Sequence, residues 1–380
     1  MGSRMRDWVS SFALVALLAG PAAAAPLYEV INLGPVSELW TCAYSVNNRG
    51  QAVGWLRPGD LYFQATLFDT TGGGNDIDLG TVGGWGDGMA LCVNDDGLAV
   101  GWSDNADDEN RATLYFGPQG LPPRDLGSLG GPGGGAACIS NQGQIVGMGL
   151  TPDGAEIACL FDPSGSGNNT MLGTLGGVES TARCINNGGQ VVGWALNGVG
   201  LMRATLFDMD HPPQQPPHNV DLGTLGGDES FAAWVNDNGV IVGYAHTDAG
   251  IKHAALFDPT GGGDNTDLGT LGGPYSGACY IGSHGEIIGW ANTDRPSTHA
   301  TIFDATGNGN NVDLNDLIDP DSGWLLKYAY SMNEKGWIVG QGIYAGHPLA
   351  HGYLLKPIPE PATVSLLALG TLALLRRRRR

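Results

Sequence analysis

Carboxylate side chains crowd one short stretch of the chain, at Asp104, Asp107, Asp108 and Glu109. Calcium takes six to eight oxygen ligands, and carboxylates commonly supply several of them. Residues 258–267 gather further oxygen donors around three consecutive glycines. Both stretches lack the ordered Asp-x-Asp-x-Asp-Gly spacing of a recognised calcium loop. The four acids are therefore weak candidates for a calcium site, and solvated acidic loops are the alternative interpretation.

Histidine, cysteine and glycine patterns predict no catalytic residue and no bound cofactor. None of the eight histidines belongs to a nucleophile motif, and His253 and His299 occupy equivalent places in a repeat, which favours a structural role. Cys92, Cys138 and Cys184 are also repeat positions, so we expect buried thiols, with disulfides as the alternative. The three-glycine segments have no following helix whose N-terminus would bind phosphate.

An internal repeat must position these residues, and it is the strongest structural signal in the chain. The segment Asp-Leu-Gly-Thr-Leu-Gly-Gly at residues 221–227 recurs with changes at 78–84, 125–131, 171–177 and 267–273, and in weaker form at 32–34 and 313–315. Each copy is followed by a small-residue segment, an Asn-rich turn, a strand like Val-Val-Gly-Trp and a strand like Ala-Thr-Leu-Phe. Seven units result.

Three positions hold in every unit. A glycine ends each turn, at Gly50, Gly97, Gly143, Gly189, Gly239, Gly285 and Gly336. A second glycine lies in the next strand, at Gly54, Gly101, Gly147, Gly193, Gly243, Gly289 and Gly340. An alanine recurs before the turn, at Ala43, Ala90, Ala136, Ala182, Ala232, Ala278 and Ala329. The strand glycines lie 46 to 51 residues apart, which is the length of one unit.

Each unit contains four short runs of β-branched or aromatic residues bounded by Gly, Asn, Asp or Pro, which is typical of strands in tight hairpins. Seven such units predict an all-β fold, a seven-bladed β-propeller. The alanine strand should lie nearest the axis, where we expect only small side chains to fit. The first strand, residues 28–34, has no partner in its own unit, and the last unit is one strand short. We expect the N-terminal strand to close the last blade and remove two sheet edges.

The repeat sequence resembles the HAF extracellular repeat family. The resemblance rests on Asp-Leu-Gly-Thr-Leu-Gly-Gly, the Ile-Asn-Asn turn, Val-Val-Gly-Trp and the His-Ala pairs that begin at His253 and His299, and less well on His351. None of the three keeps the full His-Ala-Phe, because Ala, Thr or Tyr occupies the third place. The resemblance covers nearly all of residues 28–355. It implies the architecture of an extracellular repeat protein and no catalytic activity, because the family is defined by its repeats.

The C-terminus contains Pro359, Glu360 and Pro361, an apolar run at residues 362–375 and five arginines at 376–380. A helix needs about 20 apolar residues to cross a bilayer core, so this run would sit in a membrane only as a short anchor. The arginines would remain on the cytoplasmic side. The arrangement resembles the PEP-CTERM sorting signal of Gram-negative bacteria, which implies transient membrane anchoring and cleavage near the Pro-Glu-Pro motif by an exosortase. A simple tail anchor is the alternative.

Residues 1–25 have the layout of a secretory signal peptide, with Arg4 and Arg6 before an apolar stretch and small residues at the expected cleavage site. Without residues 1–25 and the five terminal arginines, 37 acidic residues remain against 11 basic residues. So acidic a body argues against nucleic acid as a partner, because phosphates attract basic surfaces. Such a negative charge favours solubility, and it is compatible with divalent cations and with neutral or cationic polymers as partners.

The predicted organisation is a signal peptide at residues 1–25, a propeller at 26–356 and a sorting signal at 357–380. We expect an exported protein of the cell envelope, cell surface or extracellular matrix, which acts as a non-catalytic binding or structural module. Exosortase is an expected partner, and so is an extracellular polysaccharide or a surface protein, with the exopolysaccharide or biofilm matrix as the setting. The alternative is a secreted propeller lyase or glycosidase, although the acids recur around the ring without a singular pair.

The loops between the second and third strands of each unit keep nearly constant length while their sequences diverge. A rigid frame that presents varied contacts would have this pattern, because binding residues often lie on loops. We expect these loops to share one face with the Thr-Leu-Gly-Gly crossovers. Any partner should dock on that face.

Overall fold

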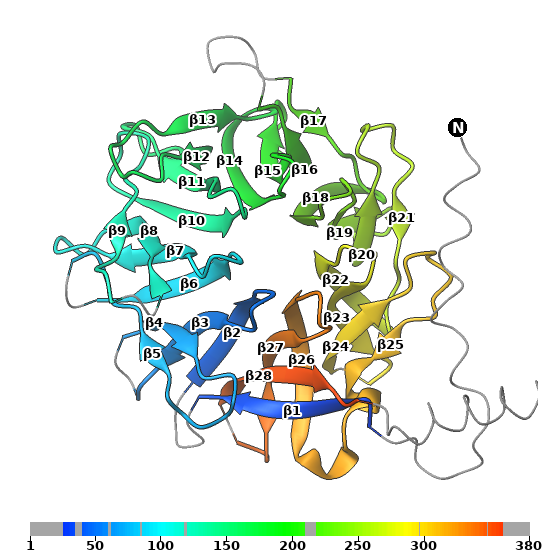
Figure 1. Cartoon of the computed structure of the whole chain (residues 1–380). Coiled ribbons are helices and arrows are strands. Elements are labelled where there is room, and N and C mark those ends of the chain that lie inside the picture. Colours follow the sequence, from blue (N-terminus) through cyan, green and yellow to red (C-terminus); the bar gives the residue numbers. More distant parts are fainter. Residues whose placement is uncertain are drawn as a thin grey trace, which may run out of the picture.

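Seven four-stranded antiparallel sheets form a ring, as in a β-propeller (Figure 1). The computed structural model describes residues 26–34, 40–59, 62–83, 86–117, 120–209, 218–295, 297–347 and 349–359. The predicted fold class is confirmed. The predicted signal peptide and the apolar and arginine parts of the sorting signal lie outside the described residues.

Blades 1 to 6 follow one another along the chain, and each begins with its innermost strand. Blade 1 contains β2 (Trp40–Val46), β3 (Ala52–Arg57), β4 (Gln64–Phe68) and β5 (Ile77–Asp78); blade 2 contains β6 (Gly88–Val93), β7 (Ala99–Asp104), β8 (Asn110–Tyr115) and β9 (Arg124–Asp125). Blade 3 contains β10 (Gly134–Ile139), β11 (Ile145–Leu150), β12 (Glu156–Phe161) and β13 (Thr170–Gly173). Blade 4 contains β14 (Gly176–Ile185), β15 (Val191–Asn197), β16 (Met202–Phe207) and β17 (Val220–Asp221).

Blades 5 and 6 repeat this order, and blade 7 differs in its outermost strand. Blade 5 contains β18 (Gly226–Val235), β19 (Ile241–Thr247), β20 (Lys252–Phe257) and β21 (Thr266–Asp267). Blade 6 contains β22 (Gly272–Ile281), β23 (Ile287–Thr293), β24 (Thr298–Phe303) and β25 (Val312–Asp313). Two short 3-10 helices follow, η2 (Leu314–Leu317) and η3 (Pro320–Ser322). Blade 7 contains β26 (Trp324–Met332), β27 (Ile338–Tyr344), β28 (Ala350–Pro357) and, outermost, β1 (Tyr28–Leu33).

The N-terminal strand closes the ring, as the sequence predicts. β1 pairs antiparallel with β28, in a register that runs from Tyr28 opposite Pro357 to Leu33 opposite Gly352 (Figure 1). The backbone nitrogen of Ile358 also donates to the oxygen of Leu27 over 2.9 Å. The two ends of the propeller are therefore joined along one seam, and no blade has an unpaired strand there.

The recurring strand glycine exists because no side chain fits at its position. It pairs with the recurring alanine in all seven blades, as Gly193 does with Ala182. A Cβ atom at Gly193 would lie 2.0 Å from the backbone oxygen of Thr181, and the equivalent distances in the other blades are 1.9 to 2.1 Å. The inner strand approaches so closely that only glycine is accommodated without a backbone shift.

A β-bulge follows the recurring alanine in every blade. The extra residues at the bulges are Tyr44, Leu91, Ala137, Arg183, Ala233, Cys279 and Tyr330, of which only Arg183 is exposed. Bulges re-aim side chains and are frequent near functional sites. Here they let large or charged side chains project from the inner strands.

The alanine strand lies innermost, as predicted, but the predicted reason for its small side chain is wrong. The alanines are buried between blades; Ala43, for example, packs with Val339 and Leu354 of blade 7. The axis itself holds large side chains. A cavity of about 140 Å3 on the axis is lined by residues from all seven blades, including Trp234 and Tyr280, whose ring centroids are 4.8 Å apart.

The Asn-rich turns have one conformation in all blades. In blade 1 the nitrogen of Gly50 donates to the oxygen of Asn47, and the nitrogen of Asn47 donates to the oxygen of Gln51, each over 3.0 Å. The turn glycine has φ between 70° and 94° in all seven blades, a left-handed conformation that glycine adopts without steric cost. This explains its recurrence in the sequence.

Asparagine side chains in these turns connect one blade to the next. Asn47 Nδ2 donates to the backbone oxygen of Asn94 in blade 2 over 2.8 Å, and Asn333 in blade 7 donates to Asn47 over 2.9 Å. Equivalent bonds come from Asn94, Asn186 and Asn236. Ser140 and Gly282 occupy this place in blades 3 and 6. Buried side-chain bonds of this kind fix the rotation of each blade against its neighbour.

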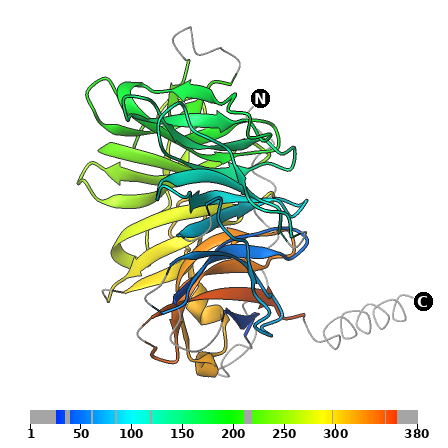
Figure 2. The same ribbon diagram turned by 90° about the vertical axis from the view of Figure 1, so that its left-hand side faces the viewer.

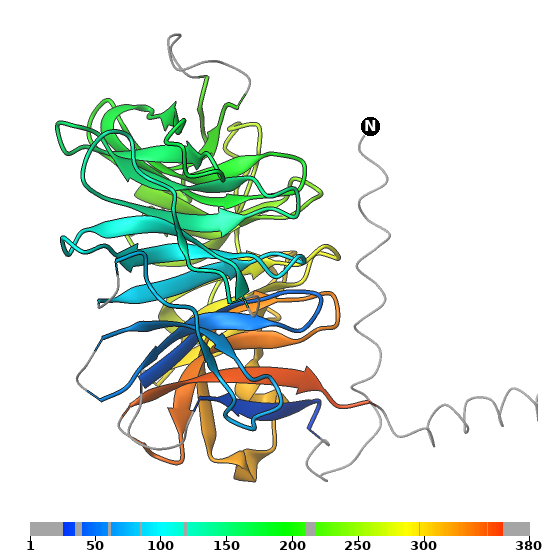
Figure 3. The same ribbon diagram turned by 60° about the vertical axis from the view of Figure 1, so that its left-hand side comes forward.

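The two faces of the ring carry different loops, and Figures 2 and 3 show the ring from its side. We call one the crossover face; it carries the loop between the second and third strands of each blade and the crossover to the next blade. The other is the turn face, with the Asn-rich turns and the loops between the third and fourth strands. The antiparallel topology therefore places the divergent loops and the crossovers on one face, as expected.

Candidate functional site

Exposed aromatic side chains gather on the crossover face. Three large aromatic side chains of the described residues are exposed: Trp40 (39%), Tyr62 (50%) and Tyr275 (49%). Trp40 and Tyr275 lie near the starts of inner strands β2 and β22, and Tyr62 lies in the loop after β3, so all three belong to this face. These exposed aromatic side chains share one face, which makes that face the stronger candidate for a binding surface.

Five side chains form what we call the aromatic belt across blades 1, 7 and 6: Trp55, Tyr44, Tyr330, Tyr328 and Trp290. The ring centroids of Tyr44 and Tyr330 are 5.3 Å apart, and those of Tyr330 and Tyr328 are 5.9 Å apart with planes within 2° of parallel. Tyr328 and Trp290 are 6.2 Å apart, and Trp55 Nε1 donates to the Tyr44 hydroxyl over 3.3 Å. Aromatic contacts of this kind hold the rings in fixed orientations.

One end of the aromatic belt opens into a cavity of about 420 Å3 between blades 5, 6 and 7, which we call the Trp290 cavity. Tyr275, Trp290 and Tyr328 supply its aromatic walls, and Lys252 and Asn292 are among its polar groups. The Lys252 ammonium nitrogen lies 4.0 Å from the centroid of Tyr244, which holds the lysine by a cation–π contact. Aromatic walls with a few fixed polar groups are the usual composition of a ligand pocket.

A second hollow, of about 550 Å3, crosses blades 2, 3 and 4, and we call it the Trp102 groove. It exists partly because Gly135 occupies a position where blades 5 and 7 carry Phe231 and Tyr328. The nearest heavy atom to a Cβ placed on Gly135 is Trp102 Cβ, at 3.9 Å, so the missing side chain leaves open space. Blade 3 is thus indented where blades 5 and 7 are filled.

Arg183, an exposed bulge residue of blade 4, supplies positive charge to the Trp102 groove near the axis. Burial raises the pKa of the Tyr44 hydroxyl, and the charge of Arg183 is one of the influences that oppose this shift. Burial likewise raises the pKa of the Cys279 thiol to about 12, again against Arg183. The Arg183 guanidinium carbon lies 5.9 Å from the ring centroid of Phe231 in blade 5, so this side chain extends towards the next inner strand.

The four predicted metal-ligand acids do not converge. Asp108 and Glu109 line the Trp102 groove, whereas Asp107 is exposed in the same loop. Asp104 accepts a hydrogen bond from the backbone nitrogen of Asp87 over 2.9 Å and so faces the crossover before blade 2. Within the part of the chain that the structure describes, no three or more His, Cys, Asp or Glu side chains are grouped to hold a metal ion. Calcium binding by these acids stays a prediction.

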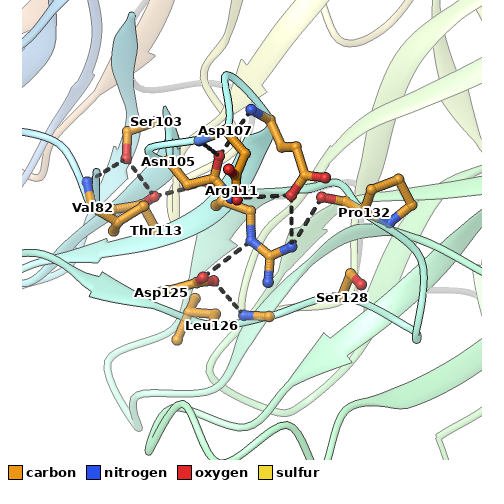
Figure 4. A network of polar contacts seen from close by, with 12 residues as sticks. Val82, Ser103, Asn105, Asp107, Arg111, Thr113, Asp125, Leu126, Ser128 and Pro132 are labelled. Carbon is orange, nitrogen blue, oxygen red and sulfur yellow. Dashed lines mark hydrogen bonds and ion pairs between the residues drawn. The ribbon is translucent and has the colours of Figure 1, made fainter. Parts of the chain in front are cut away.

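The loop that carries these acids is held by Arg111 (Figure 4). Arg111 Nε donates to Asp125 Oδ2 over 3.0 Å, and Arg111 Nη1 donates to the backbone oxygen of Pro132 over 2.9 Å. The hydroxyls of Ser103 in β7 and Thr113 in β8 are 3.0 Å apart. Arg111 Nη1 also lies 3.8 Å from Glu109 Oε2 in the loop, so Arg111 connects the loop to the outer strand of its own blade and to the next crossover.

The repeat-position histidines each contact an aspartate of their own blade. Nδ1 of His253 lies 2.8 Å from Oδ2 of Asp267, and His299 pairs in the same way with Asp313. Arg111 makes the equivalent contact in blade 2. A basic side chain at the start of the third strand therefore binds the aspartate of the Asp-Leu-Gly segment in its own blade.

All six cysteines are free, and all but Cys279 are fully buried. The sulfur atoms of Cys92 and Cys138 are 3.7 Å apart, and those of Cys138 and Cys184 are 3.9 Å apart, so the three form a row on adjacent inner strands. Burial raises the pKa of the Cys159 thiol to about 12. Buried, protonated thiols are poor nucleophiles, which agrees with a packing role.

The second acidic stretch, residues 258–267, forms a loop on the turn face that is held by its own carboxylate. Asp258 accepts from the nitrogen and hydroxyl of Thr260 over 3.0 and 2.8 Å and from the nitrogen of Gly262 over 3.1 Å. These bonds, led by that from the Thr260 backbone, lower the pKa of Asp258. Asn265 anchors the loop to blade 4 through the backbone oxygens of Leu222 and Thr224. The oxygen atoms of Asp258 therefore hold the loop in its conformation by accepting hydrogen bonds from its own residues.

The sequence patterns did not predict the aromatic belt, because its members come from three different repeat positions. Tyr44 and Tyr330 are bulge residues, Tyr328 precedes the recurring alanine, and Trp55 and Trp290 follow the strand glycine. Only the last position gave a signal, since Trp or Tyr recurs there in five units. The repeat pattern also gave no prediction for His347 and His351, which are four residues apart in the hairpin between β27 and β28.

Family comparison gives a match at the C-terminus, where residues 357–380 match the PEP-CTERM protein-sorting motif. None of the curated proteins matches the chain. No helix within the described ranges is long and apolar enough to cross a membrane. The match confirms the predicted sorting signal and indicates an exported protein that is sorted by an exosortase, with a cell-envelope or surface location in Gram-negative bacteria. Of Pro359, Glu360 and Pro361, only the first is described.

Proposed function

We propose that this chain is a non-catalytic surface or matrix protein that binds an extracellular polysaccharide through its crossover face. The observation that carries the proposal is the aromatic belt, which runs into the Trp290 cavity and is accompanied by exposed Trp40, Tyr62 and Tyr275. Trp55 is buried and the other four rings of the belt are half-buried, so an extended polymer would contact the accessible parts of those four rings together with the exposed aromatic side chains.

Sugar rings match this surface chemically. Each ring presents a face of C–H groups, which pack on the electron-rich face of Trp or Tyr, and a rim of hydroxyls, which pair with fixed polar groups. Lys252 and Asn292 supply such groups in the Trp290 cavity. Because the protein body is strongly acidic, a neutral or amine-bearing polysaccharide meets less repulsion than a polyanionic one.

The position of the sorting signal supports a crossover face that points away from the membrane. β28 runs from the crossover face to the turn face and ends at Pro357, so the PEP-CTERM motif leaves the propeller on the turn face. Ile358 is hydrogen-bonded to Leu27 at the closure seam, which leaves almost no linker between the ring and the motif. While the tail is in the membrane, the crossover face would point away from it. Exosortase cleavage would then release the same face into the matrix.

The repeats support the same assignment through their similarity to HAF extracellular repeats, a relation that we propose for all seven units. Removal of a signal peptide at residues 1–25 belongs to the proposal. So does calcium, as an accessory ion at the acidic loop of the Trp102 groove. A binding role is favoured over a lyase or glycosidase role because the carboxylates of this groove are spread along its rim.

The test is co-sedimentation of the purified protein with isolated exopolysaccharide, using Trp290→Ala and Tyr275→Ala as variants. We expect each to weaken binding about tenfold or more, as truncation of a buried aromatic anchor does. The matched control is Leu121→Ala, which removes an exposed apolar side chain from the turn face and should leave binding unchanged. Equal binding by all four proteins would refute the proposal. Release of reducing ends or unsaturated products during incubation would instead support the enzyme alternative.

A further inference from the structure

His347 and His351 lie together at the crossover-face end of blade 7. His351 is the second residue of β28, and His347 lies in the turn that joins β27 to β28. The ring centroids are 5.3 Å apart, and the ring planes are nearly perpendicular at 86°. The turn is tight, because the nitrogen of His347 donates to the oxygen of Tyr344 over 2.8 Å. His347 is thus held over His351.

The buried ring nitrogens of this pair have no hydrogen-bond partner. The His351 side chain is fully buried, and both its Nδ1 and its Nε2 lack a partner; Nδ1 of His347 is buried and lacks one too. This is exceptional, because buried polar groups are nearly always paired, and His253 and His299 each bind an aspartate. An orphaned pair of imidazoles indicates a bound group that completes their bonding.

A third unpartnered atom comes from the N-terminal strand. Oδ1 of Asn32, in β1, is also buried without a hydrogen-bond partner, while its Nδ2 donates to the backbone oxygen of Gly34. In the β1–β28 register Asn32 is opposite Tyr353, two residues from His351, so the Asn32 and His351 side chains project from the same face of the sheet. Diagonal neighbours of this kind have Cα atoms about 7–8 Å apart.

The ring separation suits ligation of one metal ion. A metal–nitrogen bond of about 2.0 to 2.1 Å puts each ring centroid about 3 Å from the ion, so tetrahedral ligands have centroids about 5 Å apart. Imidazole nitrogens suit zinc, copper and nickel, whereas calcium and magnesium prefer oxygen ligands alone. Burial, followed by the nearby charge of His347, lowers the pKa of His351.

We propose that His347 and His351 bind a divalent transition-metal ion, with the side-chain oxygen of Asn32 as a further ligand. Two histidines and one amide leave room for water in the coordination shell. Because Asn32 belongs to β1 and both histidines belong to the β27–β28 hairpin, the ion would staple the N-terminal strand to the last blade. Its role is therefore to secure ring closure, since an ion that binds only the folded state stabilises it.

The test uses Zn2+ as the probe and the full chain purified without a histidine tag. Isothermal titration and thermal unfolding should show one Zn2+ per chain and a higher Tm with Zn2+, and neither effect with Ca2+ at the same concentration. His347→Ala and His351→Gln should each weaken Zn2+ binding at least about tenfold and abolish the rise in Tm. The matched control is His246→Ala, which removes a histidine from the same face of blade 5 and should bind Zn2+ as the unmodified protein does.

Failure of the unmodified protein to bind Zn2+ would overturn the proposal. Unchanged Zn2+ binding by His347→Ala would overturn it as well, and so would an equal loss in His246→Ala. If His351→Gln does not fold, His347→Ala alone decides, because its partly exposed side chain can be removed without opening the core. Polysaccharide binding is measured separately, so the outcome here does not depend on the proposed function.

Discussion

The strand glycine gives the sharpest stability prediction, and Gly193→Ala is the test. The added Cβ would lie 2.0 Å from the backbone oxygen of Thr181 and close to the Cα of Ala182, at 3.0 Å. A backbone oxygen cannot rotate away as a side chain can, so β14 must shift. We expect a loss at the upper end of the overpacking range, about 3 kcal/mol of unfolding free energy.

This loss converts to a measurable shift in Tm. At about 2.1 cal/mol/K per residue, a ring of about 330 residues has an unfolding entropy of about 0.7 kcal/mol/K. A loss of about 3 kcal/mol therefore lowers Tm by about 4 °C, which differential scanning calorimetry resolves. The matched control is Gly198→Ala in the same blade, because nothing lies within 4 Å of a Cβ placed there. If the two variants unfold at the same temperature, the close approach of the inner strand is not the reason for the glycine.

Three further predictions concern closure, sorting and acid stability. Deletion of residues 28–34 should leave β28 as an unpaired edge and cause aggregation, and a monomeric size-exclusion profile with unchanged Tm would contradict this. Glu360→Ala should leave the uncleaved precursor in the membrane fraction, since we propose that the exosortase recognises the Pro-Glu-Pro motif; normal release of the processed protein would count against it. Hydrogen bonds, chiefly from the Ser166 hydroxyl, lower the pKa of Asp162 to about 2. Because the unfolded value is about 3.9, this stabilisation is present above pH about 4 and lost as pH falls towards 2, so Asp162→Asn should flatten the Tm profile between pH 2 and 5. An unchanged profile would show that the carboxylate does not stabilise its loop.

The repeated architecture could be predicted because each unit contains strong local signals. A turn glycine such as Gly189 requires a positive φ, and a strand such as residues 190–194 is bounded by turn residues on one side, so four strands per unit are visible in the sequence. Closure by residues 28–34 followed from counting strands. These features depend on neighbours in the chain, and local patterns report them well.

The candidate site depended on contacts between blades, which local patterns do not report. The bulges after Ala43 and Ala329 are changes of register, and no residue type at these positions predicts them. They nevertheless bring the side chains of Tyr44 and Tyr330, from blades 1 and 7, into contact. The sequence also gave no reason for the recurring strand glycine, because the group that excludes a side chain there is a backbone carbonyl on another strand. The four predicted acids show the opposite error. They are close in sequence and were expected to lie together, but Asp104 is hydrogen-bonded to the crossover before blade 2.

Hydroxyl-radical footprinting of the protein with and without isolated exopolysaccharide measures directly which face the polymer covers. We expect the polymer to protect exposed aromatic side chains of the crossover face, Trp40, Tyr62 and Tyr275, from oxidation. Leu121, which is 55% exposed on the turn face, should be oxidised equally in both samples. Protection of Leu121 without protection of the three aromatics, or no protection of any of the four, would contradict the claim that the crossover face binds the polymer.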